Sequence, residues 1–162
     1  METRRDFSTR GPGFRRDDGQ MIVDFYHLTA SPLERALASI AEKVVAGGER
    51  LLVVAEPELL ARLDEQLWSH SKDSFLPHGR ERPESQPVFL SAEPEAANGA
   101  TNIALADGRW RDEALGFART FYFFDNDGRD SARDAWRALK GRADVEARYW
   151  KQDERGKWVQ GP

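Results

Sequence analysis

The chain has 162 residues, of which 40% are hydrophobic, so it is long enough for one domain of common size with a real core. Charged residues make up 32% of the chain and leave a net charge of only −4, which argues against a basic surface of the kind that reads duplex DNA. The chain has no cysteine, which excludes disulfides, thiolate zinc sites and cysteine nucleophiles.

Residues 1–20 are polar and mixed in charge, and we expect them to form a disordered arm or an over-extended start before the domain. The five arginines of this stretch are offset by four acidic residues. It has no apolar signal-like region, and no later window reaches the roughly 18 apolar residues of a membrane span. We therefore expect a cytoplasmic protein with a single α/β domain over residues 21–159, whose fold does not depend on residues 1–20.

A strand, a helix and a second strand are predicted between residues 21 and 55. Residues 22–26 are rich in strand-forming side chains, and apolar residues then recur at helical spacing at Leu33, Leu37, Ile40 and Val44. Ser31, Pro32 and Glu34 are expected to form a capping box with proline at the first helical position. Gly47 and Gly48 end the helix, and residues 51–55 form an apolar run typical of a buried parallel strand.

The rest of the chain continues the alternation of strands and helices. A second helix is predicted over 57–68 and a last one over 130–140, with strands over 87–90 and 101–106. The aromatic run 117–124 is either another strand or the end of a helix that leads into one. This order predicts an α/β three-layer sandwich around a mostly parallel central sheet.

Parallel α/β sheets often bind nucleotides, but the sequence lacks the phosphate-binding motifs. There is no GxxxxGK[ST], and the turn over residues 27–31 lacks the glycines that let a backbone approach a pyrophosphate. Residues 125–130 resemble a calcium loop, yet Gly128 is at the fourth place instead of the sixth and Trp136 takes the place of the final glutamate. We expect this segment to be a turn that caps the following helix.

The remaining candidates for chemistry are weak. The three histidines, His27, His70 and His78, share no i, i+4 spacing of a metal site, and no serine lies in a Gly-x-Ser-x-Gly elbow. The sequence therefore gives no catalytic residue, no cofactor-binding residue and no metal ligand.

Two motifs point to a known family. Residues 63–68 (LDEQLW), followed at this spacing by 74–78 (SFLPH), resemble the signature of the DNA polymerase III chi subunit family. The segments 25–28 (FYHL) and 48–53 (GERLLV) resemble the first two strands of that family. The ending RYWKQDE, followed by GKW, is similar to members whose tails close on YWKQ. The resemblance covers about residues 21–158.

The resemblance implies a Rossmann-like fold without a nucleotide-binding loop, and a non-catalytic accessory subunit of DNA polymerase III in DNA replication. The parent assembly is a DNA-directed DNA polymerase, a nucleotidyltransferase complex. Two partners are implied: the psi subunit, through which chi joins the clamp loader, and the acidic C-terminal tail of the single-stranded-DNA-binding protein. Neither sequence-specific DNA binding nor membrane binding is implied.

An acidic tail that ends in an aromatic residue needs an apolar pocket flanked by cations. Residues 129–158 contain nine Lys/Arg against six Asp/Glu, a net charge of +3, whereas residues 1–128 sum to −7. Arg133, Arg137 and Lys140 are spaced to share one face of the last helix. By the resemblance, the tail-binding arginine aligns with Arg137 and the pocket aromatics align with Trp68 and Phe75. The family's Tyr-Lys pair is replaced here by residues 140–142 (KGR), so the cation that grips the tail stays open.

Two other functions stay open at this point. The chain could be a small α/β nucleotide-binding protein or enzyme with an unconventional site, which titration with nucleotides against an acidic peptide would test. It could also be a nucleic-acid-binding domain, which salt-dependent binding to single strands would reveal. Judged by the residues alone, Trp68 and Trp136 suit a core, and Arg133 and Arg137 suit an ordinary solvated helix face.

Overall fold

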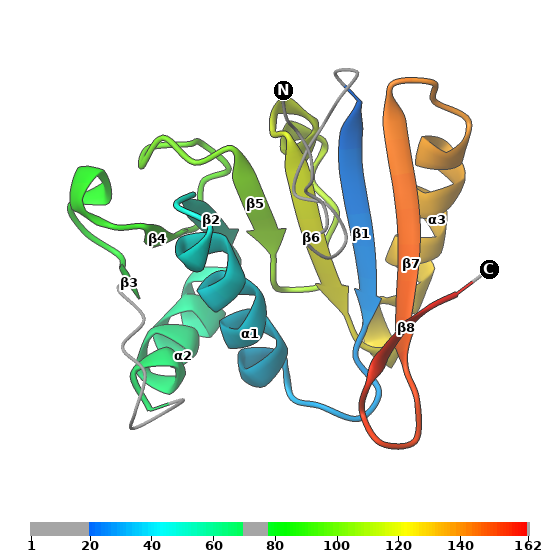
Figure 1. Cartoon of the computed structure of the whole chain (residues 1–162), viewed down its shortest axis with the longest axis horizontal. Helices are drawn as coiled ribbons and strands as arrows, with labels where there is room; N and C mark the ends of the chain where they lie inside the picture. Colours follow the sequence, from blue (N-terminus) through cyan, green and yellow to red (C-terminus); the bar gives the residue numbers. More distant parts are fainter. Residues whose placement is uncertain (1–19, 70–77, 162) are drawn as a thin grey trace.

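A computed structural model of the chain describes residues 20–69 and 78–161 (Figure 1). The predicted N-terminal arm, apart from Gln20, lies outside the described residues, and so does Phe75.

The core of the fold is one eight-stranded sheet with the order β3-β4-β2-β5-β6-β1-β7-β8. Every neighbouring pair of strands is parallel except the antiparallel β7–β8 hairpin, which confirms the predicted mostly parallel sheet. The strands are β1 (Met21–His27), β2 (Leu51–Val54), β3 (His78–Gly79), β4 (Val88–Ser91), β5 (Asn102–Leu105), β6 (Arg119–Phe124), β7 (Val145–Gln152) and β8 (Trp158–Gln160).

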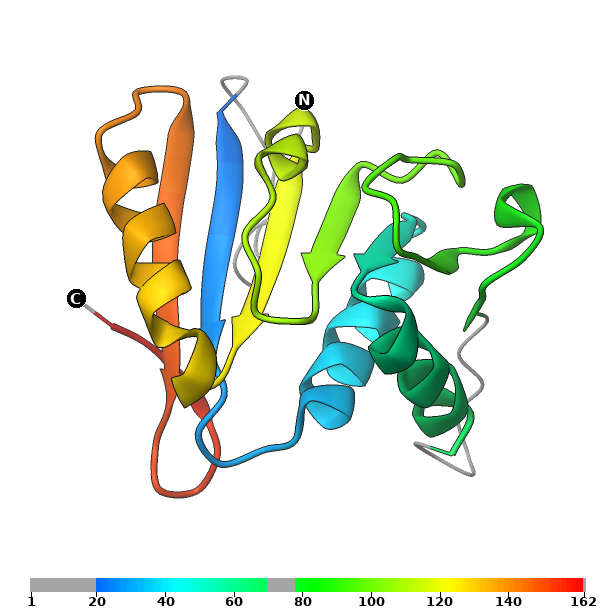
Figure 2. The same ribbon diagram turned by 180° about the vertical axis from the view of Figure 1, so that it is seen from behind.

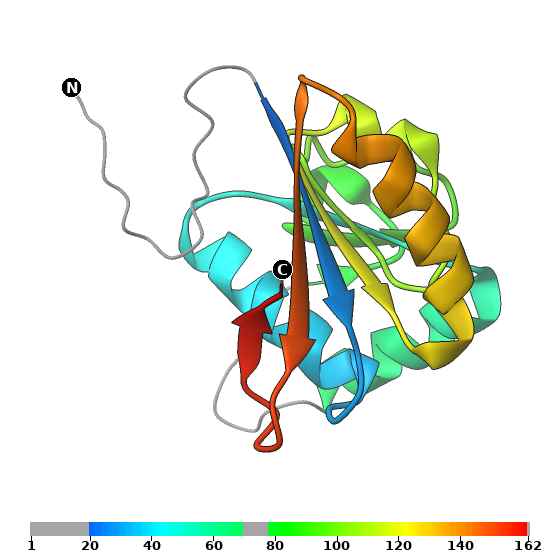
Figure 3. The ribbon, with the colours of Figure 1, turned by 90° about the vertical axis from the view of Figure 1, so that its right-hand side faces the viewer.

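Helices cover both faces of the sheet, as predicted for a Rossmann-like sandwich. The helices α1 (Leu33–Ala46) and α2 (Pro57–Trp68) pack on one face, and α3 (Arg129–Lys140) packs on the other (Figures 1 and 2). Side chains alternate along each strand, so Tyr26 and Phe121 join the core with α1 and α2, whereas Phe25 and Tyr122 join the core with α3. Figure 3 shows the strands β1 and β7 nearly edge-on, with α3 on one side of them and α1 on the other.

The predicted capping box of the first helix is wrong. The helix begins at Leu33 with Pro32 as its N-cap, and no side chain caps it. The hydroxyl of Ser31 instead accepts a hydrogen bond of 2.9 Å from Nε2 of Gln152, a residue of β7. A long-range contact has therefore replaced the local capping pattern. The run 117–124 proves to be strand β6 from Arg119 onward, and a 3₁₀ helix, η3 (Asp112–Gly116), precedes it.

A buried carboxylate joins the strands β1, β6 and β7. Asp24 of β1 is fully buried and accepts two hydrogen bonds from Arg119 of β6, at 2.9 and 2.7 Å. It also accepts two from Arg148 of β7, at 2.7 and 3.0 Å, and one from the indole of Trp150 at 2.9 Å. Burial alone would raise the pKa of Asp24, but the two arginines outweigh it and hold the pKa below its ordinary value.

Candidate functional site

Helix α3 presents its cations to solvent because its apolar residues face the sheet. Ala132, Ala135 and Leu139 are buried, whereas Arg133, Arg137 and Lys140 are exposed. Just before the helix, Asp125 Oδ1 accepts hydrogen bonds from the backbone N–H groups of Asp127 at 3.0 Å and Gly128 at 3.2 Å. The segment that resembles a calcium loop is therefore a 3₁₀ turn, η4 (Asn126–Gly128), which Asp125 caps and which leads into α3. The α3 helix itself has Gly128 as its N-cap and no side-chain cap, so the predicted cap of that helix is wrong.

A cleft of about 280 Å³ lies between α3 and the strands β1, β6 and β7. Its floor is aromatic: the rings of Phe25 and Trp136 meet edge to face at 5.2 Å, and those of Trp136 and Tyr149 at 6.3 Å. Two arginines lie one helical turn apart beside these rings. The lining residues are Phe25, Phe124, Arg129, Ala132, Arg133, Trp136 and Tyr149.

The cations of the cleft are available for a ligand. Within residues 20–69 and 78–161, Arg129 forms no ion pair, and Arg133 has only a 3.6 Å contact with the exposed Asp130. The ammonium group of Lys140 lies 5.1 Å from the centroid of the Trp136 ring. An apolar floor with guanidinium groups at its rim suits a peptide that carries carboxylates and an apolar end.

Tyr149, at one side of the cleft, is held in place by His27. Its hydroxyl lies 3.1 Å from His27 Nδ1, while His27 Nε2 lies 2.9 Å from Asn126 Oδ1. The imidazole also stacks on Phe124 at 4.9 Å. Gly161 packs against the Tyr149 ring so closely that an added Cβ would lie 2.5 Å from Cδ2 of Tyr149.

The structure separates the residues that the sequence pointed to. Arg133 lines the cleft, whereas Arg137 and Lys140 are exposed on the same helix without lining it. Trp68 is the last residue of α2, which packs on the opposite face of the sheet from α3. Phe75 lies outside the described residues.

Several lining residues were missed by the sequence reasoning. Arg129 lies four residues before Arg133, so the same helical spacing extends to it. Phe25, Phe124 and Tyr149 belong to three different strands, and strand pairing brings them together. Their only signal in the sequence is their aromatic character.

The position at which many doubly wound folds bind phosphate is filled here by a side chain. Gln152 Oε1 accepts hydrogen bonds from three consecutive backbone N–H groups after β1, those of Thr29, Ala30 and Ser31, at 3.2, 3.0 and 3.1 Å. Its Nε2 group donates to Gly156 O at 3.0 Å as well as to Ser31. The glutamine of the YWKQ motif thus occupies the turn that lacks phosphate-binding glycines.

The crevice at the carboxyl ends of the strands is acidic. It encloses about 390 Å³, and the described residues that line it include Glu34, Glu56, Asp107 and Asp125 but one cation, Arg62. Burial raises the pKa of Asp107, but hydrogen bonds and charge from Arg111 outweigh this and lower the pKa. This surplus of carboxylates opposes a phosphate group.

Among the described residues, no three His, Asp or Glu side chains converge in a way that would hold a metal ion. No described helix combines the length and the apolar character needed to cross a membrane.

Comparison with known proteins agrees with the architecture of the chain. The family model described as DNA polymerase III chi subunit, HolC, matches residues 21–146. No curated protein sequence matches the chain. Since the family match takes in most of the sequence, the chain belongs to the DNA polymerase III chi subunit family and is an accessory subunit of that polymerase in DNA replication.

Proposed function

We propose that this chain links the clamp-loader complex, through psi, to the acidic C-terminal tail of the single-stranded-DNA-binding protein. The observation that carries the tail contact is the aromatic cleft beside α3 with Arg129 and Arg133 at its rim. Membership of the chi family supports psi as the partner on the clamp-loader side.

The cleft and the exposed cations of α3 suit each part of such a tail. The aromatic terminus would enter between Phe25, Phe124 and Trp136, where it is removed from water. Its carboxylate would pair with a guanidinium at the rim, where a charge-assisted hydrogen bond is stronger than a neutral one. Aspartates farther from the terminus would lie along the exposed cations Arg137 and Lys140.

This arrangement assigns a smaller role to Arg137 than the family resemblance does. Arg137 is exposed and outside the cleft, so its interaction with the tail is screened by water and ions. Because α2 and α3 pack on opposite faces of the sheet, the α3 cleft accounts for the tail contact without Trp68 or Phe75.

We also propose that the chain has no catalytic or nucleotide-binding activity of its own. The three backbone N–H groups after β1 already bind Gln152 Oε1, and the neighbouring crevice is rich in carboxylates. Both features oppose a nucleotide phosphate, so they disfavour the nucleotide-binding alternative. Turnover of a nucleotide that copurifies with the chain and disappears in a point variant would contradict this proposal.

Calorimetric titration of the full chain with a tail peptide tests the site. Arg133→Ala removes a charge-assisted contact of about 1.5 to 3 kcal/mol, so we expect affinity to fall by about tenfold or more. Arg137→Ala should cost less, about twofold to fivefold, as for an exposed ion pair.

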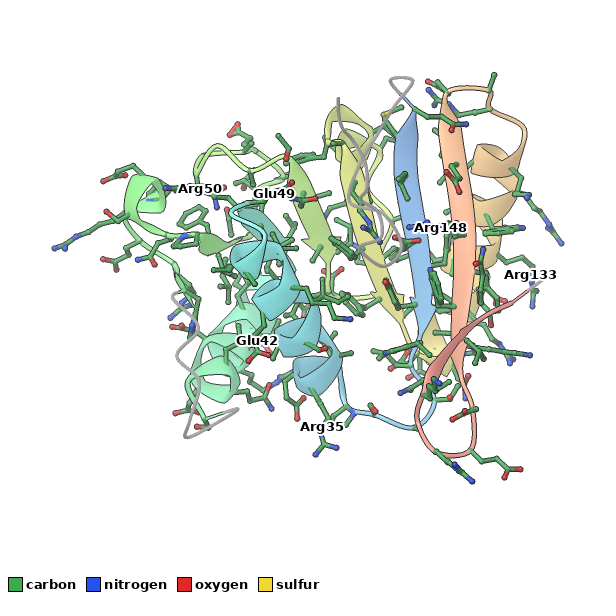
Figure 4. The ribbon with its side chains drawn as sticks, viewed as in Figure 1. Arg35, Glu42, Glu49, Arg50, Arg133 and Arg148 are labelled. Carbon is green, nitrogen blue, oxygen red and sulfur yellow. The ribbon has the colours of Figure 1, made fainter. Side chains whose placement is uncertain are left out.

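A matched control is Arg35→Ala, because Arg35 is an exposed arginine on α1, on the opposite face of the sheet from Arg133 (Figure 4). We expect that variant to bind the peptide like the wild type. The wild type should bind a peptide that lacks the terminal residue at least as weakly as the Arg133→Ala variant binds the intact tail peptide. Equal affinity of the wild type and the Arg133 variant would contradict the proposed site.

A further inference from the structure

We propose that the acidic tail adds to the sheet as a short parallel strand at the outer edge of β7, where it pairs with the backbone of Ala147. This inference rests on the proposed function, because the terminus of the same tail occupies the α3 cleft. It assigns a second contact surface and an extended conformation to the bound tail.

The outer edge of β7 is only partly paired. β8 pairs with residues 150–152 of β7, and the N–H group of Gly161 donates to the C=O group of Tyr149 at 2.7 Å (Figure 1). Closer to the start of β7, no strand of the described part of the chain lies on this side. An unpaired strand edge presents N–H and C=O groups with which an extended peptide can pair.

The directions of the backbone groups single out Ala147 on this edge. The C=O group of Asp144 accepts from the backbone of β1 at 2.9 Å, whereas that of Tyr149 points away from β1 toward β8. Because these directions alternate along a strand, the N–H and C=O groups of Ala147 point outward and those of its two neighbours point toward β1. Val145 also points outward but is buried, whereas Ala147 is only half-buried.

The cations of α3 lie along the same edge. One stripe of the helix, spaced by four, three and four residues, contains Arg129, Arg133, Trp136 and Lys140. The Trp136 ring contacts Tyr149 of β7 and lies close to the Lys140 ammonium group, so the stripe faces β7. Figure 4 shows Arg133 on the outer side of β7, away from β1. A strand added here would hold its carboxylates beside positive charges, as an acidic peptide requires.

The position of the cleft gives the direction of the added strand. Tyr149 lines the cleft and follows Ala147 along β7. A tail whose terminus lies in the cleft therefore passes Ala147 first, which makes it parallel to β7. Every second side chain of the tail then faces α3, and the others lie on the opposite face of the sheet with the exposed Glu146.

A second copy of the chain suits this edge less well than the tail does. Two antiparallel β7 strands related by a two-fold axis at Glu146 would place their Glu146 side chains opposite each other, where like charges repel. An axis at Ala147 would pair Val145 with Tyr149, whose C=O group already accepts a hydrogen bond. The tail has the opposite charge to the α3 stripe and meets neither obstacle.

Hydrogen exchange of the isotope-labelled full chain, followed by NMR with and without the tail peptide, tests the inference. In the free protein the Ala147 amide should exchange rapidly, whereas the amides of Glu146 and Arg148, which bind β1, should exchange slowly. At saturation with the peptide, we expect exchange of the Ala147 amide to slow by about tenfold or more. The amides of Glu146 and Arg148 are internal controls and should change little.

Calorimetry with N-methylated tail peptides gives a second measurement on the unaltered protein. Methylation of the one amide that donates to the C=O group of Ala147 should weaken binding by about fivefold to tenfold, because a hydrogen bond is lost. Methylation of the amides on either side of it should weaken binding by less than about twofold, because those amides point away from β7. These peptides are matched controls, since their side chains and charges are identical.

The outcomes distinguish the inference from the function on which it rests. Tail binding that leaves the Ala147 amide in rapid exchange, or that tolerates every N-methyl group, would overturn the added strand and leave the cleft as the docking site. A dimer of the free chain in sedimentation, with the Ala147 amide already protected, would assign the edge to a second copy and overturn the added strand. Absence of tail binding would overturn the proposed function and the inference together.

Discussion

Replacement of Asp24 by asparagine should destabilise the fold strongly. The substitution preserves the size of the side chain but removes the charge that Arg119 and Arg148 share. Asp24 is fully buried and Arg119 nearly so, so their charges are hardly solvated. Removing one partner of a buried ion pair costs about 3 to 5 kcal/mol, because the remaining charge stays buried.

The expected loss can be measured by thermal and urea unfolding at neutral pH. For a domain of this size, about 1 kcal/mol shifts the melting temperature by about 2 to 4 °C, so Asp24→Asn should melt about 6 to 20 °C lower. The matched control is Asp144→Asn, which removes the carboxylate of an equally well-formed but exposed pair with Arg142. We expect that variant to melt like the wild type.

The pH dependence gives an independent check. Because the folded-state pKa of Asp24 is below its unfolded value, its contribution is fully present above about pH 4 and is lost as the pH falls through the folded pKa. The difference in stability between wild type and Asp24→Asn should therefore shrink in acid. An Asp24→Asn protein that melts within the error of the wild type at neutral pH would refute the reasoning.

Two smaller perturbations test the contacts around β7. Gln152→Ala leaves three backbone N–H groups without their acceptor, so it should lower the free energy of unfolding in urea by about 1 to 3 kcal/mol. Gln152→Glu retains an acceptor oxygen and should therefore lose less stability. Gly161→Ala should displace the Tyr149 ring and weaken tail binding in calorimetry, because its Cβ would lie 2.5 Å from the ring. Its control is Gly116→Ala, where an added Cβ meets nothing within 4 Å, and unchanged tail affinity in the Gly161 variant would show that the ring position is unimportant.

Periodicity in the sequence predicted the layers of the fold because local patterns record which face of an element is buried. The apolar spacing of Leu60, Leu63 and Leu67 and the apolar run 51–54 correspond to the observed helix α2 and strand β2. The two strands after α3 were not predicted as strands. Residues 145–152 are mostly half-buried and mix charged with aromatic side chains. Arg148 and Trp150 bind Asp24, whereas Tyr149 lines the cleft.

The candidate site was harder to predict because it is formed by pairing of distant segments. Tyr149 and His27 are 122 residues apart in sequence and meet only because β7 pairs with β1. The same pairing places Gln152 beside Ser31 and removes Ser31 from its predicted cap. Arg133 was predicted from helical spacing, which is a local pattern. The placement of α2 and α3 on opposite faces of the sheet depends instead on the chain crossovers.

The most direct test of the central claim is to map the tail contact by NMR, with the isotope-labelled full chain and a peptide of the acidic tail. We predict that the backbone and side-chain signals of Phe124, Arg129, Arg133, Trp136 and Tyr149 shift on titration and saturate together. Signals of α2, including that of the Trp68 backbone, should stay unchanged. Shifts confined to α2 and residues 70–77, with the α3 cleft unaffected, would contradict the account.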